Sequence, residues 1–452
     1  MRTLAVVGCA LLALAGATAA RADTPGDALI HADAARLAGY TGAGVTVALV
    51  DTGVDSKNPA LAGAVVAEHC IVSGGGCPNG SDEQDGPGSA QDDQGHGTAM
   101  ATILTGTAPG VKLVVVKVAD RNGRTSPQQI IAGLNWVLTH HPEAKLVSVS
   151  LGSDFVFSGP CDNLVSINTV YTQYTTVIDA LRANGQTVFA SAGNQGSHAA
   201  ITAPACIHAA LAVGAVYSTA FGPYLAPNVC RDAETGPYEI ACFSNSSTEL
   251  DLLAVGAPVD TVGLGSAETL AGTSAATAQA TGAAAILLGA DPALTPDALE
   301  SVLKTTGLPI TDPRNRITTP LIDVAAALGQ LTGKPVPIPP TVGVAAPSTP
   351  TLSAPTLPRL ALALRPVVFK SGVRTQRLVL GDAGTGSLKV RLASAPPWLA
   401  VTPSSLLIGA GATGTLRLAL RPHAGAITGE IRIATDDPSA GVVSIRVQAK
   451  GR

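Results

Sequence analysis

Four short segments of the chain carry side chains that could together perform acyl transfer. Asp51 follows an apolar run, His96 stands between two glycines, Asn194 follows another glycine, and Ser274 comes directly after Gly272-Thr273. A hydroxyl becomes a nucleophile when an imidazole accepts its proton, and a carboxylate must then orient the ring and stabilise its charged form. An amide side chain can donate a hydrogen bond to the oxyanion that forms on the attacked carbonyl. The four residue types are therefore those that acyl transfer requires.

The predicted roles follow from the chemistry of each group. His96 would accept the proton of Ser274, and Asp51 would fix the tautomer of the imidazole. Asn194 and the backbone N–H of Ser274 would bind the oxyanion. We therefore interpret Asp51, His96, Asn194 and Ser274 as the candidate catalytic residues.

Ser274 stands near the start of a run of small residues that is typical of a helix. The run extends from Ala271 to Gly282 and continues into an apolar stretch that ends at Leu288. The first turn of a helix has unpaired N–H groups and the positive end of the dipole, which favour developing negative charge. The alternative is that Gly-Thr-Ser only caps the helix, because Ser and Thr are frequent N-caps. The other three segments favour the catalytic interpretation.

Alternating strand and helix patterns must position these segments. Runs rich in β-branched residues predict buried parallel strands at Val45–Val50, Leu113–Val118, Leu146–Leu151, Thr187–Ala190 and Leu211–Gly214. Ser126 has the pattern of a helix cap, followed by Pro127 at the first helical position and by Gln129, which completes a capping box. The alternation predicts an α/β fold with a doubly wound, mostly parallel sheet. In such a sheet, functional side chains gather at the carboxyl ends of the strands.

The four segments also match the motifs of a known family in its own order. The motifs are Val-Asp-Thr-Gly-Val-Asp around Asp51, Gly-His-Gly-Thr around His96, Ser-Ala-Gly-Asn up to Asn194 and Gly-Thr-Ser up to Ser274. Further matches lie at Val149–Gly152, Ala203–Cys206, Val213–Ala215 and Cys242–Asn245, so the likeness covers roughly residues 25–330. The chain resembles a subtilisin-like serine protease. The resemblance implies a secreted serine endopeptidase with Asp51, His96 and Ser274 as the triad and Asn194 as the oxyanion donor.

The resemblance also implies where a substrate binds. In the family, the segments that correspond to Ser150, Leu151 and Gly152 and to Asn122-Gly123-Arg124 hold the substrate backbone in extended form, which is β-augmentation. Ala192 and Gly193 would line the pocket for the residue before the cut. Their small size implies room for a large side chain.

The chain departs from the family pattern near the nucleophile. Ala275 and Ala278 stand where the family normally has Met and Pro, Ala99 stands where a second His is frequent, and Thr102 replaces a usual Gly. None of these positions transfers a proton. The altered helix keeps open the alternative of a catalytically silent peptide-binding or surface-interaction protein on the same fold. A processing transpeptidase, which uses the same acyl-enzyme, is a third alternative.

The length of 452 residues suggests two folded domains after processing. Residues 1–22 have the pattern of a signal peptide, because Arg2 precedes an apolar stretch and Ala20-Arg21-Ala22 offers a cleavage site. We predict a subtilisin-like peptidase domain at 23–332, a Pro-rich linker at 333–358 and an immunoglobulin-like β-sandwich at 359–452, where apolar residues alternate in twos. About 23 residues separate the predicted cleavage site from the first strand, so we expect no folded propeptide. We expect a periplasmic, extracellular or cell-surface location.

The cysteines fit an exported protein. Once the signal peptide with Cys9 is removed, six cysteines remain. Short loops favour the pairs Cys70 with Cys77 and Cys230 with Cys242, which leaves Cys161 with Cys206, although the sequence alone does not fix the pairing. Free buried thiols are the alternative. No cluster of Cys and His suggests zinc.

Charge divides the chain into two parts. Residues 359–452 hold 13 Lys and Arg against 4 Asp and Glu, whereas the first 358 residues hold 15 against 28. The basic C-terminal domain could associate with an anionic surface, but its Arg residues are scattered along strands, which favours a solvated face. We expect protein or peptide substrates, no nucleic acid, and no transmembrane segment after removal of the signal peptide.

No cofactor is expected for the chemistry. A loop with several carboxylates could hold structural calcium, since this cation prefers flexible carboxylate ligands. Its spacing matches no firm pattern, so a solvated acidic loop is the favoured interpretation. The carboxylates belong to Asp82, Glu83, Asp85, Asp92 and Asp93.

Overall fold

The computed structural model describes residues 24–153, 155–162, 169–226, 229–339, 360–361, 367–369, 373–382, 388–409, 412–422, 427–435 and 442–449. The predicted signal peptide and most of the predicted linker lie outside these residues. The chain divides into two compact units, Met1–Pro339 and Pro340–Arg452. The predicted domain boundaries stay predictions, and each unit is described by itself.

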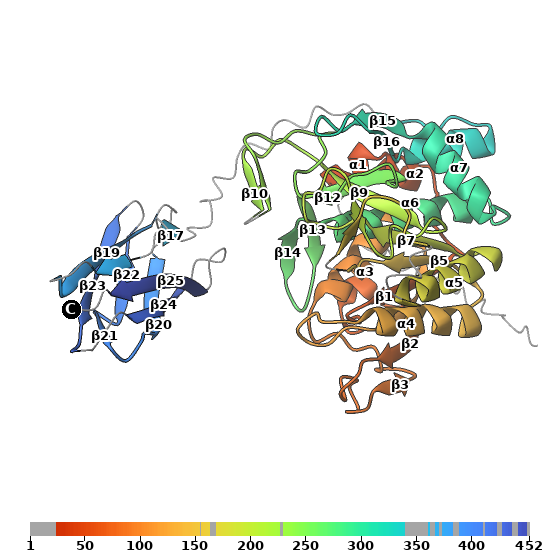
Figure 1. Ribbon diagram of the computed structural model, residues 1–452. Coiled ribbons are helices and arrows are strands. Elements are labelled where there is room, and N and C mark those ends of the chain that lie inside the picture. Colours follow the sequence, from red (N-terminus) through yellow and green to blue (C-terminus); the bar gives the residue numbers. More distant parts are fainter. Residues whose placement is uncertain are drawn as a thin grey trace, which may run out of the picture. The chain divides into compact units, whose positions relative to one another are not determined.

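The first unit is built on one ten-stranded sheet (Figure 1). All neighbouring pairs from β16 to β2 are parallel, whereas the two edge strands β15 and β3 pair antiparallel. The predicted mostly parallel sheet is thereby confirmed. The order across the sheet is β15 (Leu308–Thr311), β16 (Thr318–Leu321), β12 (Leu252–Ala257), β9 (Leu211–Tyr217), β7 (Thr187–Ser191), β5 (Ala144–Val149), β1 (Thr46–Asp51), β4 (Lys112–Lys117), β2 (Val65–Ile71) and β3 (Glu83–Asp85).

The register of the central strands brings their carboxyl ends into one row. Asp51 of β1 pairs with Lys117 of β4, and Val50 pairs with Val149 at the end of β5. Val149 in turn pairs with Ala190 of β7. The residues that follow these strands therefore meet at one edge of the sheet.

Helices cover both faces of this sheet (Figure 1). On one face, α3 (His96–Thr107) and α6 (Thr273–Ala290) pack against each other. On the other face, α4 (Pro127–His140) packs against α5 (Thr169–Ala183), and Ser126 caps α4 by accepting a hydrogen bond from Gln129 N, as predicted. The small residues of α6 allow close approach, since a Cβ at Gly282 would lie 3.0 Å from the Leu104 carbonyl oxygen.

The residues before the first strand form part of the same unit. They fold into α1 (Pro25–Leu29) and α2 (Ala32–Leu37), with Ile30 fully buried between them. Helix α2 packs against α8 (Val324–Thr332), and the backbone N–H of Val324 donates to the Ile30 carbonyl at 2.9 Å. The two ends of the folded unit thus lie together. The described part of this unit also contains η1 (Pro59–Leu61) and α7 (Pro296–Thr306).

Within the described residues, the first unit also contains three short two-stranded ribbons and three disulfides. The ribbons are β6 (Val156–Phe157) with β8 (Ile201–Thr202), β10 (Tyr224–Ala226) with β11 (Cys230–Asp232), and β13 (Val259–Val262) with β14 (Ala267–Leu270). The disulfides join Cys70 with Cys77, Cys161 with Cys206, and Cys230 with Cys242. The first and third are the pairs that the short loops favour, and the second is the pair that these two leave.

The second unit is all-β and has its own core. Its first sheet has the order β17 (Leu360–Ala361), β19 (Thr375–Asp382), β23 (Thr413–Leu420) and β21 (Leu399–Thr402). Its second sheet has the order β18 (Val367–Phe369), β25 (Val442–Ala449), β24 (Ile427–Thr435), β20 (Leu388–Ser394) and β22 (Ser405–Ile408). Alternate residues such as Leu380 and Ile433 are buried in one cluster shared by both sheets.

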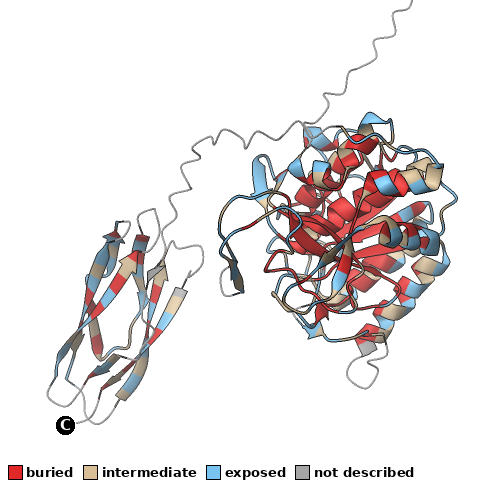
Figure 2. Cartoon of the chain, turned by 90° about the horizontal axis from the view of Figure 1, so that it is seen from above, coloured by how far each residue is buried: buried red, intermediate tan, exposed pale blue. Residues whose placement is uncertain are grey.

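Each unit has its own set of buried residues (Figure 2). In the first unit most buried apolar residues form one large cluster along the central strands and α6, while Cys70, Val72 and Cys77 form a small separate one. In the second unit one cluster contains residues of both sheets. Within the described residues, no helix is both long enough and apolar enough to cross a membrane.

Candidate active site

The imidazole of His96 lies against the carboxylate of Asp51. Asp51 is the last residue of β1, and His96 is the first residue of α3. His96 Nδ1 lies 2.7 Å from Asp51 Oδ1, which also accepts a hydrogen bond from the Thr52 N–H at 2.7 Å. Because an ionised carboxylate can only accept, Nδ1 carries the hydrogen and Nε2 is left as the acceptor. A fully buried Asp51 therefore presets the tautomer that a general base needs.

The surroundings raise the pKa of His96 above its ordinary value of 6.5. Burial of the ring is the largest single effect and lowers the pKa, but the charge and the hydrogen bond of Asp51, together with two further carboxylates, more than offset it. The more distant carboxylates of Asp92 and Glu268 act in the same direction. The site thus stabilises the imidazolium that forms when His96 accepts a proton.

Ser274 lies in the first turn of α6 and contacts the end of β5. Its hydroxyl donates to the Ser150 carbonyl at 3.1 Å, and the Ser150 hydroxyl donates to the Ser274 carbonyl at 3.0 Å. In the described part of the chain, no hydrogen bond joins Ser274 to His96. Catalytic hydrogen bonds are often long or misaligned before a substrate binds. The structure therefore brings the predicted nucleophile to the edge where Asp51 and His96 meet, with its hydroxyl turned toward β5.

Asn194 is held by its carbonyl oxygen, which leaves its amide donor available. Asn194 Oδ1 accepts hydrogen bonds from the Thr273 N–H at 2.8 Å and from the Thr273 hydroxyl at 2.9 Å. Because a backbone N–H can only donate, this contact fixes which side-chain atom is the oxygen. Nδ2 then lies on the side of Gly272, 3.4 Å from the position of a Cβ there. An amide donor thus stands beside the start of the nucleophile helix.

A buried amide supports the loop that carries Asn194. Asn245 Oδ1 accepts from the backbone N–H groups of Gln195 and Ser197 at 3.1 and 3.0 Å, and its Nδ2 donates to the Ala192 carbonyl at 2.9 Å. The sequence marks Asn245 only as the end of the Cys242–Asn245 match. Its role depends on contacts with residues about fifty positions earlier in the chain, which the sequence pattern does not show.

The predicted substrate-binding residues lie around the same edge. Ser150, Leu151 and Gly152 follow β5, and Gly123 lies in the turn between Asp120 and Arg124. Ala192 is fully buried, and Gly193 is partly exposed with φ of 101°. A Cβ at Gly193 would lie 2.5 Å from Asn245 Nδ2, so the position requires Gly. Their roles toward a substrate stay predictions.

The residues that depart from the family pattern are packed inside the unit. Ala275 and Ala278 are 1% and 0% exposed inside a continuous α6. Thr102 joins α3 to the β13–β14 hairpin, because its hydroxyl lies 2.5 Å from that of Thr261, which itself donates to the Ala99 carbonyl at 3.0 Å. The hairpin leads directly into Gly272 and Ser274. Thr102 therefore links the His96 helix to the segment that carries the nucleophile.

The acidic loop does not gather its carboxylates as a cation site would. Asp82 accepts from the Gly75 N–H, Glu83 and Asp85 both contact His69, and Asp93 pairs with Lys117 at 2.7 Å. Within the described residues, no group of three or more His, Cys, Asp and Glu side chains could hold a metal ion. The interpretation as a solvated loop is wrong for Asp92, which is 4% exposed because protein donors surround its carboxylate.

Comparison with known proteins gives a consistent result. Residues 42–327 match the Subtilase family, Peptidase_S8. An extracellular serine proteinase of Thermus sp. (strain Rt41A) is 34% identical over 270 residues, which cover 58% of this chain and 55% of that protein. Subtilisin E of Bacillus subtilis (strain 168) is 31% identical over 279 residues, which cover 59% of this chain and 61% of that protein. The chain therefore spans less than two thirds of the length of these relatives.

The fold is similar to that of a solved structure of proteases from Pseudoalteromonas arctica PAMC 21717. The TM-score between the two chains is 0.52, and their sequences are 21% identical. The likeness covers 67% of this chain and 94% of that chain. At this identity it supports the arrangement of strands and helices alone.

Proposed function

Because the chain belongs to the subtilase family, we propose that it is an exported serine endopeptidase that cleaves peptide bonds through an acyl-enzyme on Ser274. The observation that carries the proposal is the 2.7 Å contact between Asp51 and His96 at the sheet edge where Ser274 and Asn194 also lie. Three disulfides, together with a relative named as extracellular, support export.

The first half of the proposed reaction forms the acyl-enzyme. Ser274 Oγ attacks the substrate carbonyl while His96 Nε2 accepts the hydroxyl proton, and the buried Asp51 carboxylate stabilises the imidazolium. Negative charge develops on the carbonyl oxygen, where Asn194 Nδ2 and the Ser274 N–H would donate hydrogen bonds. The intermediate then expels the amine, which takes the proton from His96.

The second half regenerates the hydroxyl. A water molecule attacks the acyl group as His96 accepts one of its protons, and the same donors stabilise the second oxyanion. Collapse releases the carboxylic acid as His96 returns the proton to Ser274. No step requires a metal or an organic cofactor.

Substrate binding follows from the strand end beside the nucleophile. An extended peptide would lie between residues 150–152 and the segment around Gly123, with backbone hydrogen bonds to both. Ala192 and Gly193 would form part of the pocket for the residue before the cut. Protein and peptide substrates are therefore proposed, and a library of peptides would define the preferred residue.

A covalent probe tests the proposal. A fluorophosphonate should label the purified protein at Ser274, and Ser274→Ala should abolish both labelling and cleavage of a denatured protein. Ser301→Ala is the matched control, because Ser301 is exposed on α7 away from the site. If the wild-type protein neither reacts with the probe nor cleaves a denatured protein, the peptide-binding interpretation replaces the enzymatic one. If acyl transfer to an added amine exceeds hydrolysis, the transpeptidase interpretation replaces it.

A further inference from the structure

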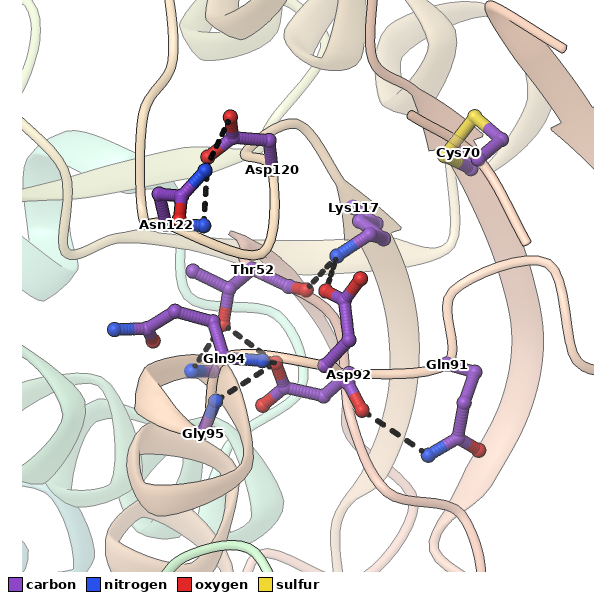
Figure 3. Close-up of polar contacts among 12 residues, drawn as sticks. Thr52, Cys70, Gln91, Asp92, Gln94, Gly95, Lys117, Asp120 and Asn122 are labelled. Carbon is purple, nitrogen blue, oxygen red and sulfur yellow. Dashed lines mark hydrogen bonds and ion pairs between the residues drawn. A yellow bond between two sulfur atoms is a disulfide. The ribbon is translucent and has the colours of Figure 1, made fainter. Parts of the chain in front are cut away.

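One buried carboxylate accepts hydrogen bonds from residues on both sides of His96. Asp92 Oδ1 accepts from the backbone N–H groups of Gln94 and Gly95, each at 2.9 Å. Asp92 Oδ2 accepts from the N–H of Thr98 at 3.0 Å and from its hydroxyl at 2.6 Å. Figure 3 shows the Asp92 side chain directed at Gln94 and Gly95. The loop before α3 and the first turn of α3 are thus tied to one side chain.

The same carboxylate reaches the segment that carries Asp51. The Thr52 hydroxyl donates to Asp92 Oδ1 at 3.0 Å (Figure 3). The same hydroxyl accepts from the Gly97 N–H at 2.8 Å. The Thr52 carbonyl accepts from the buried Lys117 ammonium at 2.7 Å. Since Thr52 follows Asp51 and Gly97 follows His96, this bridge joins the two members of the candidate dyad through their neighbours.

The arrangement replaces a missing helix cap. Gly95 stands at the N-cap position of α3 with φ of 110° and has no side chain to accept a hydrogen bond. Asp92 supplies the acceptor instead and places a negative charge at the positive end of the helix. A buried carboxylate with five donors is well satisfied, and each bond to an ionised acceptor is stronger than a neutral one. The start of α3 is therefore held in place by Asp92.

We propose that Asp92 is a positioning residue that holds the His96 imidazole against Asp51. The inference rests on the proposed function, because it concerns the geometry of the same base. Asp92 contacts neither His96 nor Asp51 by a side-chain hydrogen bond, so it acts through Thr52, Gly95 and Gly97. A displacement of about 1 Å in a reacting group can cost about 10²-fold in rate.

The charge of Asp92 has a second, separable effect. His96 is faced by the carboxylates of Asp51, Asp92 and Glu268, all of which raise its pKa against the opposing effect of burial. Removal of the Asp92 charge should therefore lower the pKa of His96. A purely structural loss of folded protein would reduce the amount of active enzyme without moving its pH profile.

Asp92→Asn tests the proposal in the full-length protein. We expect kcat to fall about 10²-fold with KM within about twofold, and the acid limb of kcat/KM to move to lower pH. Asp82→Asn is the matched control, since it removes one acidic charge from an exposed position in the preceding loop. Asp82→Asn should keep kcat and the pH profile of the wild type. Wild-type kcat and an unmoved acid limb in Asp92→Asn would overturn the proposal.

A second pair of variants covers the case in which Asp92→Asn does not fold. Thr52→Val keeps the shape of the side chain but removes the hydroxyl that joins Asp92 to Gly97. It should lower kcat, and Thr52→Ser should recover most of the loss. Equal kcat in Thr52→Val and the wild type would count against the bridge.

A spectroscopic readout separates this proposal from the enzymatic function. The Nδ1 proton of His96 should give a low-field resonance in the Ser274→Ala variant, which cannot turn over. We expect Asp92→Asn in that background to shift or broaden the resonance, while Asp82→Asn leaves it in place. If the resonance depends on Asp92 but the wild-type protein shows no hydrolysis, the proposed function fails and the positioning role stands. If the wild-type protein hydrolyses its substrate and Asp92→Asn leaves the resonance unchanged, the positioning role is refuted and the proposed function stands.

Discussion

Replacement of Asp51 by Asn removes one charge and keeps the size of the side chain. In the wild type, the fully buried Asp51 accepts the His96 Nδ1 hydrogen at 2.7 Å and the Thr52 N–H at 2.7 Å through the same oxygen. In Asp51→Asn, the Thr52 N–H still requires an oxygen acceptor. The Asn side chain must therefore accept the Thr52 N–H and contact the His96 imidazole at the same time, and it has no negative charge to stabilise the imidazolium.

The size of the effect follows from the charge and the tautomer. Two unit charges about 4 Å apart attract by about 4 kcal/mol at an effective dielectric constant of about 20. Loss of this attraction for the imidazolium in the transition state corresponds to about 10³-fold in kcat, at about 1.4 kcal/mol per factor of ten. An amide that presents its N–H₂ group to Nδ1 also favours the wrong tautomer, which brings the expected loss to about 10⁴-fold.

The assay is the steady-state hydrolysis of a peptide nitroanilide across the pH range. A general base must be neutral, so kcat/KM of the wild type should fall as pH falls through the pKa of His96, which lies above 6.5. In Asp51→Asn, the carboxylate that raises this pKa most is gone, so the acid limb should move to lower pH. KM should stay within about twofold, because Asp51 is buried beneath the site.

Asp55→Asn is the matched control for charge. Asp55 lies four residues after Asp51, is only partly buried, and accepts the Lys57 N–H in a local turn at 3.1 Å. Asp55→Asn should leave kcat within about twofold, since a partly exposed charge outside the dyad is screened. A loss of less than tenfold in Asp51→Asn, or equal losses in the two variants, would refute the assignment of Asp51.

Three further outcomes are expected. Asn194→Ala should lower kcat by about 10²–10³-fold with little change in KM, a size known for such a donor in a subtilisin, which is a relative of this chain; steady-state kinetics checks it. Replacement of both Cys161 and Cys206 by Ala opens a loop with a sequence separation of 45 and should lower the free energy of unfolding by about 4 kcal/mol, which denaturant titration of the Ser274→Ala background measures. The Asp323 carboxylate, 3.0 Å from His31 Nδ1, raises the pKa of His31 above 6.5, so this pair stabilises fully below pH 6.5 and its contribution is lost as pH rises through the raised pKa. Melting temperatures between about pH 6 and about pH 9 should therefore fall less in Asp323→Asn than in the parent.

The sequence predicts the sheet well because strand ends and motifs coincide. The five predicted strands all occur, with bounds shifted by a few residues, and Asp51 stands at the carboxyl end of its strand. The other five strands of this sheet, which are β2, β3, β12, β15 and β16, are absent from the prediction, and two of them show why. In β2, Glu68 and His69 are 7% and 2% exposed and break the apolar pattern that marks a buried strand. The run Leu252–Ala257 in β12 is apolar throughout, so the spacing of apolar residues does not distinguish a strand from a helix there.

The candidate site is predicted residue by residue, but its supporting contacts are not. Asp92 belongs to an acidic stretch, and nothing in its local sequence shows that Thr52, forty positions earlier, donates to it. The bond between the Ser274 hydroxyl and the Ser150 carbonyl likewise joins residues 124 positions apart. Such contacts depend on the strand register and on the path of loops, which motifs do not encode.

The proposed endopeptidase would be exposed to cleavage by its own copies, and the joined ends of the first unit bear on where such cleavage occurs. Chain ends and exposed irregular segments are the usual sites of proteolytic nicking unless they are tied down. Here α1 packs against α2, α2 packs against α8, and His31 pairs with Asp323 at 3.0 Å. Residues 334–339, in contrast, have no helix or strand and are largely exposed. Autolysis should therefore begin after α8 and trim the chain there, leaving the unit that contains Asp51, His96 and Ser274 whole.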